Sequence, residues 1–378
     1  MIRTTRILLT VVLAIGAVLP ALSNTQTDGN AAAGAVFVMT NSAGHNEIIA
    51  YKRGPDGSLE EGQSFQTGGR GSSGVTDPLG SQGSLTISQD HSLLFAVNAG
   101  SGDISVFRVH GFTLSLLDKV PCSGSEPVAV AQHGNLVYVV NAGGSSNVVG
   151  FHLDSDGKLK PIAGSIAFLT ANNSGAASLS FSPDGQFLLV TEKLTNNIDA
   201  FHIQIDGTLA PIVVNPSAGP GAFAVLFAPN GAALVAETGP SGGHNASAIS
   251  SYSVLANGTL SPISISVPTL GAATCWLAVT PDGRFVYTSN SASSTISGFA
   301  ISATGALTPL AGTVVGTNPP GSTNLDIAIS SYGKFLYTLN SGTGTISIFG
   351  INQDGALTNL GDMGGLPASA GFNGIAAI

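Results

Sequence analysis

The residues best suited to chemistry are polar side chains that interrupt a largely apolar repeat. Glu192 ends one short apolar run and is followed by Lys193, and Glu237 ends the corresponding run of the next repeat unit. His244 follows Glu237 in a loop rich in Gly, Ser and Asn. A carboxylate can orient and deprotonate a water, and an imidazole can protonate a leaving oxygen. We therefore take Glu192, Glu237 and His244 as candidate catalytic residues.

Four further residues are candidates for holding a ligand beside these groups: Lys193, Trp276, Asp326 and Asn290. Trp276 is the only tryptophan, and its ring could lie against a sugar or an aromatic face. Two structural alternatives stay open. Glu192 and Lys193 could form an ordinary surface ion pair, and Trp276 could pack between repeat units.

Metal and cofactor motifs are absent from the sequence. No Gly-x-Ser-x-Gly, His-Glu-x-x-His or P-loop pattern occurs. Cys122 and Cys275, the two cysteines, have no zinc-like partner spacing, and we expect both to be free thiols. Asp-Gly pairs such as Asp184-Gly185 lack EF-hand spacing and are typical of tight turns. We therefore expect no metal ligands and no cofactor.

A repeat along the whole chain must position these residues. An aromatic residue is followed, seven or eight positions later, by a leucine in seven pairs: Tyr51/Leu59, Phe107/Leu114, Phe151/Leu159, Phe201/Leu209, Tyr252/Leu260, Phe299/Leu307 and Phe349/Leu357. The leucines recur roughly every 50 residues, a period typical of β-propeller blades. Alternating apolar runs and Gly-bearing turns within each copy predict four strands.

The end of the chain predicts how the ring closes. Residues 373–378 repeat the pattern of residues 324–329, so the last segment should supply the innermost strand of the first blade. We therefore predict an all-β, seven-bladed β-propeller with four-stranded blades, closed by the C-terminal strand. An open β-solenoid would not need a single strand at its end.

The predicted topology sorts the candidate residues between two faces. Loops that lead into the innermost strands, and loops between second and third strands, should surround one mouth of the central channel. The candidates at blades four to six fall there, whereas the Asp-Gly hairpins fall on the opposite face. We therefore expect function at this mouth, because regular turns need no Glu, Lys or Trp to fold.

The N-terminus and the composition indicate where the protein works. Arg3 and Arg6 precede an apolar run too short to span a bilayer, which predicts a signal peptide over 1–23 and a secreted or periplasmic product. A linker over 24–34 and a propeller over 35–378 should follow. The net charge is −9, with 12 Lys and Arg, so nucleic acid and phosphorylated ligands are poor candidates as partners.

The stretch from Thr280 to Asn290, TPDGRFVYTSN, resembles the repeats of the lactonase-family propellers. That family includes propeller-type 6-phosphogluconolactonases and carboxymuconate cyclases. The resemblance implies hydrolysis or isomerisation of a lactone, which we expect to be an unphosphorylated sugar or aromatic lactone. The alternative is a non-catalytic propeller that binds a cell-wall carbohydrate or a protein partner at its channel mouth.

Overall fold

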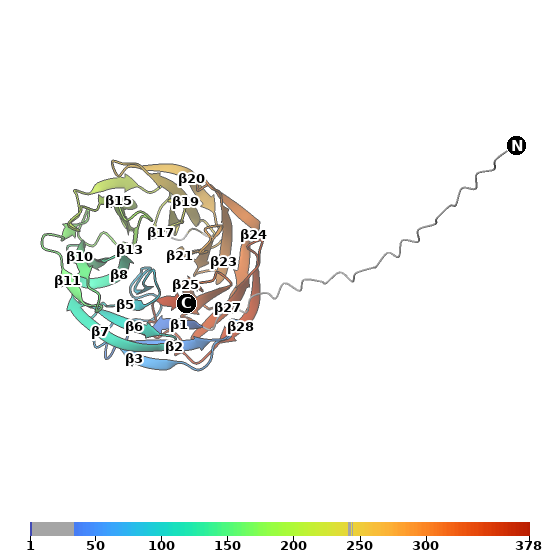
Figure 1. The fold of residues 1–378 in the computed structure, drawn as a ribbon, viewed down its shortest axis with the longest axis horizontal. Helices are drawn as coiled ribbons and strands as arrows, with labels where there is room; N and C mark the ends of the chain where they lie inside the picture. The colour runs from blue at the N-terminus through green and yellow to red at the C-terminus, as the bar shows by residue number, and fades with distance from the viewer. Residues whose placement is uncertain (2–33, 241–242, 244) are drawn as a thin grey trace. The chain divides into compact units, whose positions relative to one another are not determined.

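The computed structural model describes Met1, residues 34–240, residue 243 and residues 245–378. Seven antiparallel sheets surround a central channel in the described part of the chain, and this confirms the seven-bladed propeller (Figure 1). No α-helix occurs among these residues, so none of them forms a helical membrane span. Apart from Met1 and Gly34, the predicted signal peptide (1–23) and linker (24–34) lie outside the described residues.

The first three blades follow one another along the chain, innermost strand first except in blade one. Blade one holds β1 (Gly34–Met39), β2 (Glu47–Arg53) and β3 (Gln63–Gln66). Blade two holds β4 (Leu85–Ile87), β5 (Leu93–Asn98), β6 (Asp103–His110) and β7 (Thr113–Pro121). Blade three holds β8 (Ser125–His133), β9 (Leu136–Gly143), β10 (Asn147–Leu153), β11 (Leu159–Pro161) and a short fifth strand, β12 (Ala167–Phe168).

The last four blades each have four strands. Blade four holds β13 (Ala176–Phe181), β14 (Phe187–Glu192), β15 (Asn197–His202) and β16 (Val213–Pro216). Blade five holds β17 (Ala222–Phe227), β18 (Ala233–Glu237), β19 (Ala248–Val254) and β20 (Leu260–Pro268). Blade six holds β21 (Thr274–Val279), β22 (Phe285–Asn290), β23 (Thr295–Ile301) and β24 (Leu307–Thr317). Blade seven holds β25 (Asn324–Ile329), β26 (Phe335–Asn340), β27 (Thr345–Ile351) and β28 (Leu357–Met363).

The ring closes as the sequence predicts. The final strand β29 (Ile375–Ala377) pairs antiparallel with β1, Val36 opposite Ala377 and Val38 opposite Ile375. Blade one therefore takes its innermost strand from the end of the chain, and β1, β2 and β3 complete it. Arg53 strengthens this closure, because its Nε donates a hydrogen bond of 3.1 Å to the carbonyl of Ile378.

The repeat aromatics form the packing between blades. Six of them, Phe107, Phe151, Phe201, Tyr252, Phe299 and Phe349, are at most 1% exposed. The hairpins between first and second strands are fixed by their own side chains: Asp184 accepts hydrogen bonds from Ser182 Oγ at 2.5 Å and Gln186 N at 3.1 Å. Gly185 between them has a φ of +70°, which glycine adopts without strain. Cys122 and Cys275 are both buried and not bonded to each other.

Candidate functional site: the two ends of the channel

The blade topology gives the channel two distinct ends. Strands alternate in direction within each antiparallel blade, so loops of one kind all lie on one face. We call the face with the loops between second and third strands the mouth face. The face with the hairpins between first and second strands is the hairpin face. The sequence analysis placed its candidate site on the mouth face.

A connection between blades one and two fills the channel at the mouth face. Residues 70–84, the plug segment, follow β3 and precede β4, and they lie inside the ring (Figure 1). Ser81 Oγ donates a hydrogen bond of 2.8 Å to the carbonyl of Val128 in blade three. The backbone N–H of Gln82 donates one of 2.9 Å to the carbonyl of Ala177 in blade four. The plug segment is therefore hydrogen-bonded to the innermost strands of blades three and four.

Gln82 extends this closure across the channel to blade six. Its Nε2 donates to the carbonyl of Leu277 at 2.6 Å, and its Oε1 accepts from the N–H of Leu277 at 3.0 Å. The amide side chain thus bonds to β21 as a neighbouring strand would. Gln82 and the plug segment separate the mouth end of the channel from its hairpin end.

Trp276 and Lys193 hold the plug segment rather than an open pocket. Trp276 is buried, and its Nε1 donates a hydrogen bond of 2.8 Å to the carbonyl of Ser81. Lys193 Nζ donates one of 2.6 Å to the carbonyl of Gly80 and lies 5.2 Å from the ring centre of Phe223. The rings of Phe223 and Trp276 are in turn 5.1 Å apart. The three side chains therefore form one contiguous cluster beneath the plug segment, in which the rings of Phe223 and Trp276 meet edge-on.

The plug segment turns at a glycine where Lys193 meets it. Gly80 has a φ of +54°, and a Cβ there would lie 2.2 Å from Lys193 Nζ. Asp77 lies in the same turn, and its Oδ1 accepts hydrogen bonds from Gly80 N at 3.0 Å and Asn373 Nδ2 at 3.1 Å. Burial lowers the pKa of Lys193, and the charge of Asp77 opposes this effect. Lys193, which the sequence predicts to bind a ligand, therefore makes its contacts within the fold.

Glu192 is buried inside blade four. Its Oε1 accepts a hydrogen bond from Thr170 N at 2.9 Å, and its Oε2 accepts bonds from the hydroxyls of Thr170 and Thr195. Although burial acts to raise the pKa of Glu192, these hydrogen bonds hold it below its ordinary value. Glu192 and Lys193 form no ion pair, because each bonds to a different part of the chain.

Asp199 on β15 forms a carboxyl pair with Glu192. In blades two, six and seven, the asparagine that ends the second strand bonds instead to a serine hydroxyl on the third strand: Asn98–Ser105, Asn290–Ser297 and Asn340–Ser347. Asp199 is fully buried, and burial together with the charge of Glu192 raises its pKa to about 8. The pair therefore holds a proton at neutral pH where other blades have a neutral amide and hydroxyl.

Glu237 and Asn290 are also buried within their blades. Glu237 accepts hydrogen bonds from Gly219 N at 3.0 Å, Ser250 Oγ at 2.6 Å and Ser266 Oγ at 2.7 Å. Asn290 donates to Ser297 Oγ at 2.8 Å within blade six. Their polar groups are satisfied by neighbouring strands. His244 lies outside the described residues.

A groove remains on the mouth face between blades five and six. It has a volume of about 740 Å³ and is lined by Thr238, Gly239, Pro240, Gly243, Asn245, Leu270, Ala272, Ala273, Ala292, Ser293 and Thr295. Among these described residues no side chain titrates. Neither Glu237 nor Glu192 lines the groove.

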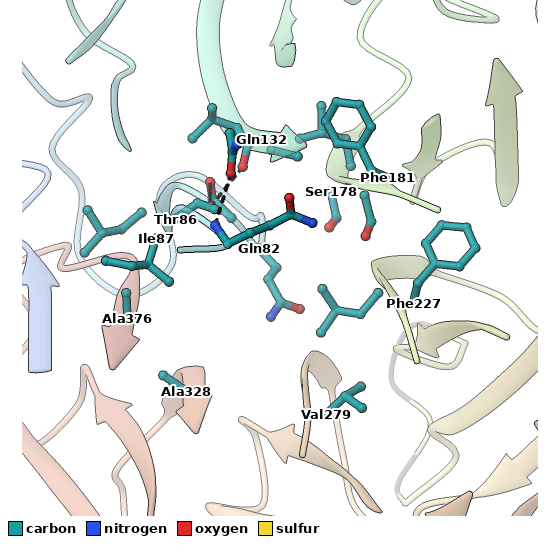
Figure 2. A pocket seen from close by; sticks show the side chains of 18 of the residues that line it. Gln82, Thr86, Ile87, Gln132, Ser178, Phe181, Phe227, Val279, Ala328 and Ala376 are labelled. Atoms are coloured by element: carbon teal, nitrogen blue, oxygen red, sulfur yellow. Dashed lines mark hydrogen bonds between the residues drawn. The ribbon is translucent and has the colours of Figure 1, made fainter. Parts of the chain in front are cut away.

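The hairpin end of the channel contains a cavity of about 500 Å³. Gln82 lies at its inner end, and the hairpins near Gln89, His133 and Pro183 surround its outer end. Figure 2 shows Gln132 of blade three on one side of this space and Val279 and Ala328 of blades six and seven across from it. Hydroxyl and amide groups face apolar side chains across the cavity, an arrangement typical of small-molecule sites.

Asp326 is the one buried carboxyl among the residues that line this cavity. Its Oδ1 accepts a hydrogen bond of 2.9 Å from the N–H of Ile327, and its Oδ2 one of 3.3 Å from the N–H of Ile375 in β29. Burial raises the pKa of Asp326 to about 7, although the two N–H groups favour the charged form. The closing strand thus holds a titratable carboxyl beside the cavity.

The outer rim of the cavity is fixed by contacts between the hairpins of blades two and three. Gln132 Oε1 accepts a hydrogen bond from Gln89 N at 3.1 Å, drawn as a dashed line in Figure 2. Gln89 Nε2 lies 3.1 Å from His133 Nδ1, and the His133 ring stacks on Phe181 at 5.5 Å. These contacts position the amides before any ligand binds. Among the described residues, no group of three His, Cys, Asp or Glu side chains could hold a metal ion.

The family assignment follows from a comparison of sequences. The family model described as lactonase, 7-bladed beta-propeller matches residues 34–170 and 226–326, more than half of the chain. The chain belongs to this family. Among curated proteins, none matches the sequence of this lactonase-family propeller.

Solved structures with the same fold are distant in sequence from this lactonase-family chain. The periplasmic gluconolactonase of Pseudomonas aeruginosa has a TM-score of 0.68 at 19% identity, over 91% of this chain and 99% of that one. A proposed 6-phosphogluconolactonase from Bacteroides uniformis has a TM-score of 0.67 at 21% identity, over 90% and 98%. A protein from Lactobacillus plantarum has a TM-score of 0.70 at 19% identity, over 91% and 100%. At these identities the likeness establishes the fold alone.

The sequence analysis missed most of the residues that line the cavity. Of its candidates, only Asp326 lies there, and the structure does not bring Glu192, Glu237 and Trp276 together around an open space. Gln82 and Gln132 were overlooked because they belong to the long connection after the first blade and to a hairpin, and His133 was interpreted as structural. One signal was available: the interval from Leu59 to Leu114 is the longest between repeat leucines and contains the plug segment.

Proposed function

We propose that this lactonase-family propeller hydrolyses an unphosphorylated lactone outside the cytoplasm. The observation that carries the proposal is the cavity at the hairpin end of the channel, whose lining includes a buried carboxyl but no Lys or Arg. Hydrolysis of a lactone needs a group that activates water, and a carboxyl with a pKa near neutrality suits that task. Membership of the lactonase family supports the reaction class.

Charge argues against a phosphorylated substrate. A phosphate ester carries close to two negative charges at neutral pH and is usually bound by Arg, Lys or helix N-termini. The lining of the cavity offers none of these, and the chain as a whole has a net charge of −9. An uncharged lactone enters such a cavity without an electrostatic penalty.

The location outside the cytoplasm rests on the N-terminal sequence. Arg3, Arg6 and the apolar run after them match a secretory signal peptide. A periplasmic gluconolactonase shares the fold, which agrees with this location. Fusion of residues 1–34 to a reporter enzyme that is active only after export would test it; cytoplasmic retention of the fusion would contradict it.

The reaction itself can be tested by proton release. Hydrolysis of a lactone yields a carboxylic acid, which acidifies a weakly buffered solution at neutral pH. Purified protein should accelerate acid release from uncharged sugar or aromatic lactones above the spontaneous rate and leave 6-phosphogluconolactone unaffected. Heat-denatured protein is the control. Unchanged rates across the uncharged panel would refute hydrolysis, and ligand binding without turnover would favour the non-catalytic alternative.

A further inference from the structure

The hairpin-end cavity combines three features. It lies on the channel axis, it is large enough for a single sugar ring, and a buried carboxyl lines it. The plug segment closes its inner end through Gln82, so a ligand must enter from the hairpin face. The channel is thus a pocket with one open end.

The lining defines the chemistry of the ligand. Ser178 and Ser180 contribute hydroxyls to the lining. The amides of Gln82, Gln89 and Gln132 already bond within the protein, so each keeps only part of its hydrogen-bonding capacity for a ligand. Side chains such as Val279 and Ile327 supply apolar walls. An uncharged ring with several hydroxyl groups matches this combination, because its hydroxyls meet the amides and its C–H faces meet the apolar walls.

Asp326 is held in a way that leaves it able to exchange a proton. Its two contacts are backbone N–H groups, which orient the carboxylate without supplying a positive charge. No Lys or Arg lines the cavity, and the negative charge of Asp77 in the plug segment also acts to raise the pKa of Asp326. His133 at the outer rim is the other titratable side chain of the lining. Because burial raises the pKa of Asp326 to about 7, both protonation states are populated at neutral pH.

We infer that Asp326 is the general base that activates water against an uncharged, hydroxylated sugar lactone bound in the hairpin-end cavity. This inference rests on the proposed function and adds the site, the catalytic group and the substrate class. Asp326 accepts a proton from water as the water oxygen bonds to the lactone carbonyl carbon. The ring C–O bond then breaks, and the proton on Asp326 passes to the departing ring oxygen. The products are a hydroxy acid and the regenerated carboxylate.

The pH dependence of the D326N variant tests the assignment of Asp326. With an uncharged sugar lactone as substrate, D326N should lower kcat by about 100-fold or more, the usual contribution of a general base. The acidic limb of the kcat/KM profile of the parent protein, expected near pH 7, should vanish. The matched control is D199N, which alters a buried carboxyl with a raised pKa that does not line the cavity. D199N should keep both kcat and the acidic limb.

A second variant tests the cavity without changing a titratable group. Ala328 lines the cavity across from Gln132, so A328L should fill part of the space and raise KM while changing kcat little (Figure 2). The same variant should weaken binding of a sugar lactam, a non-hydrolysable analogue of the lactone, measured by calorimetry. This experiment measures binding alone, so it tests the cavity as the ligand site even if D326N folds poorly.

The outcomes separate the inference from the proposed function. Turnover by the parent protein that survives in D326N and A328L but is lost in E237Q would place the reaction at the mouth and overturn the inference alone. Absence of turnover by the parent protein would refute the proposed function and with it the catalytic role of Asp326. Lactam binding that A328L leaves unchanged would refute the cavity as the site.

Discussion

The two ends of the channel differ in how their polar groups are used. At the mouth, Lys193 and Trp276 depart from the repeat, yet each bonds to the plug segment. At the hairpin end, Asp326 is among the residues that line a cavity, and its contacts are two backbone N–H groups. The departures at the mouth are thus explained by closure of the channel. A polar residue that breaks a repeat indicates function only when its bonding capacity remains open to a ligand.

Removal of the closing strand should have the largest effect, because it contributes to both ends. Asn373 bonds to Asp77 at the mouth, and Ile375–Ala377 line the cavity and bond to Asp326. A chain that stops at Pro367 should lose β29 and leave the innermost edge of β1 unpaired. Thermal unfolding should show a large fall in melting temperature. A melting temperature within a degree or two of the parent's would refute closure by this strand.

Truncation of Trp276 at the closed end of the channel should have the second largest effect on stability. W276A removes a fully buried aromatic ring and leaves the carbonyl of Ser81 without its donor. We expect a loss of about 3–5 kcal/mol in the free energy of unfolding, typical of such truncations. Denaturant unfolding measures it. F223L, which changes the neighbouring ring but keeps the indole donor, should cost clearly less; equal costs would show that the hydrogen bond to the plug segment is unimportant.

Loss of the Gln82 side chain should connect the two ends of the channel and should lower the free energy of unfolding by a moderate amount. Q82A leaves both the N–H and the carbonyl of Leu277 without a partner, and each unmet buried group costs about 1–3 kcal/mol. Denaturant unfolding should show this loss, and a crystal structure of the variant should show the two spaces joined. Unchanged stability would mean that Gln82 is not a structural partition.

The carboxyl pair in blade four predicts a smaller, pH-dependent effect. The pKa of Asp199 is about 8 in the folded chain and 3.8 for an ordinary aspartate, so the folded state retains a proton that the unfolded chain releases. Its contribution to stability is fully present below about pH 4 and is lost as pH rises to about 8. D199S restores the serine found in blades two, six and seven. Its stability relative to the parent should therefore rise between pH 5 and pH 9 in urea unfolding.

The D199N variant serves as the control for this prediction, because it removes the titratable carboxyl group but keeps the volume of the side chain. It should show the same trend with pH as D199S. A difference from the parent that stays constant across the pH range would show that Asp199 does not titrate in this interval.

The sequence predicts the fold far better than the site, for a physical reason. Strand alternation, Asp-Gly turns and the copy of Asn324–Ile329 at Asn373–Ile378 are local patterns, and they suffice for seven blades and their closure. The plug segment has no such periodicity, and its path depends on contacts with blades three, four and six. Whether Glu192 or Glu237 reaches solvent depends on hydroxyls brought from neighbouring strands, such as Thr170 and Ser250. The repeat could indicate Asp326, because it places this residue near the start of the innermost strand of blade seven.

The position of a bound sugar lactam in a crystal structure of the parent protein tests the central claim most directly. The account predicts a ligand between Gln82 and the hairpin face, with its carbonyl group near Asp326 and the plug segment still in place. A ligand bound instead at the mouth face, beside the loop that follows Glu237, would contradict the account and favour the site expected from the sequence.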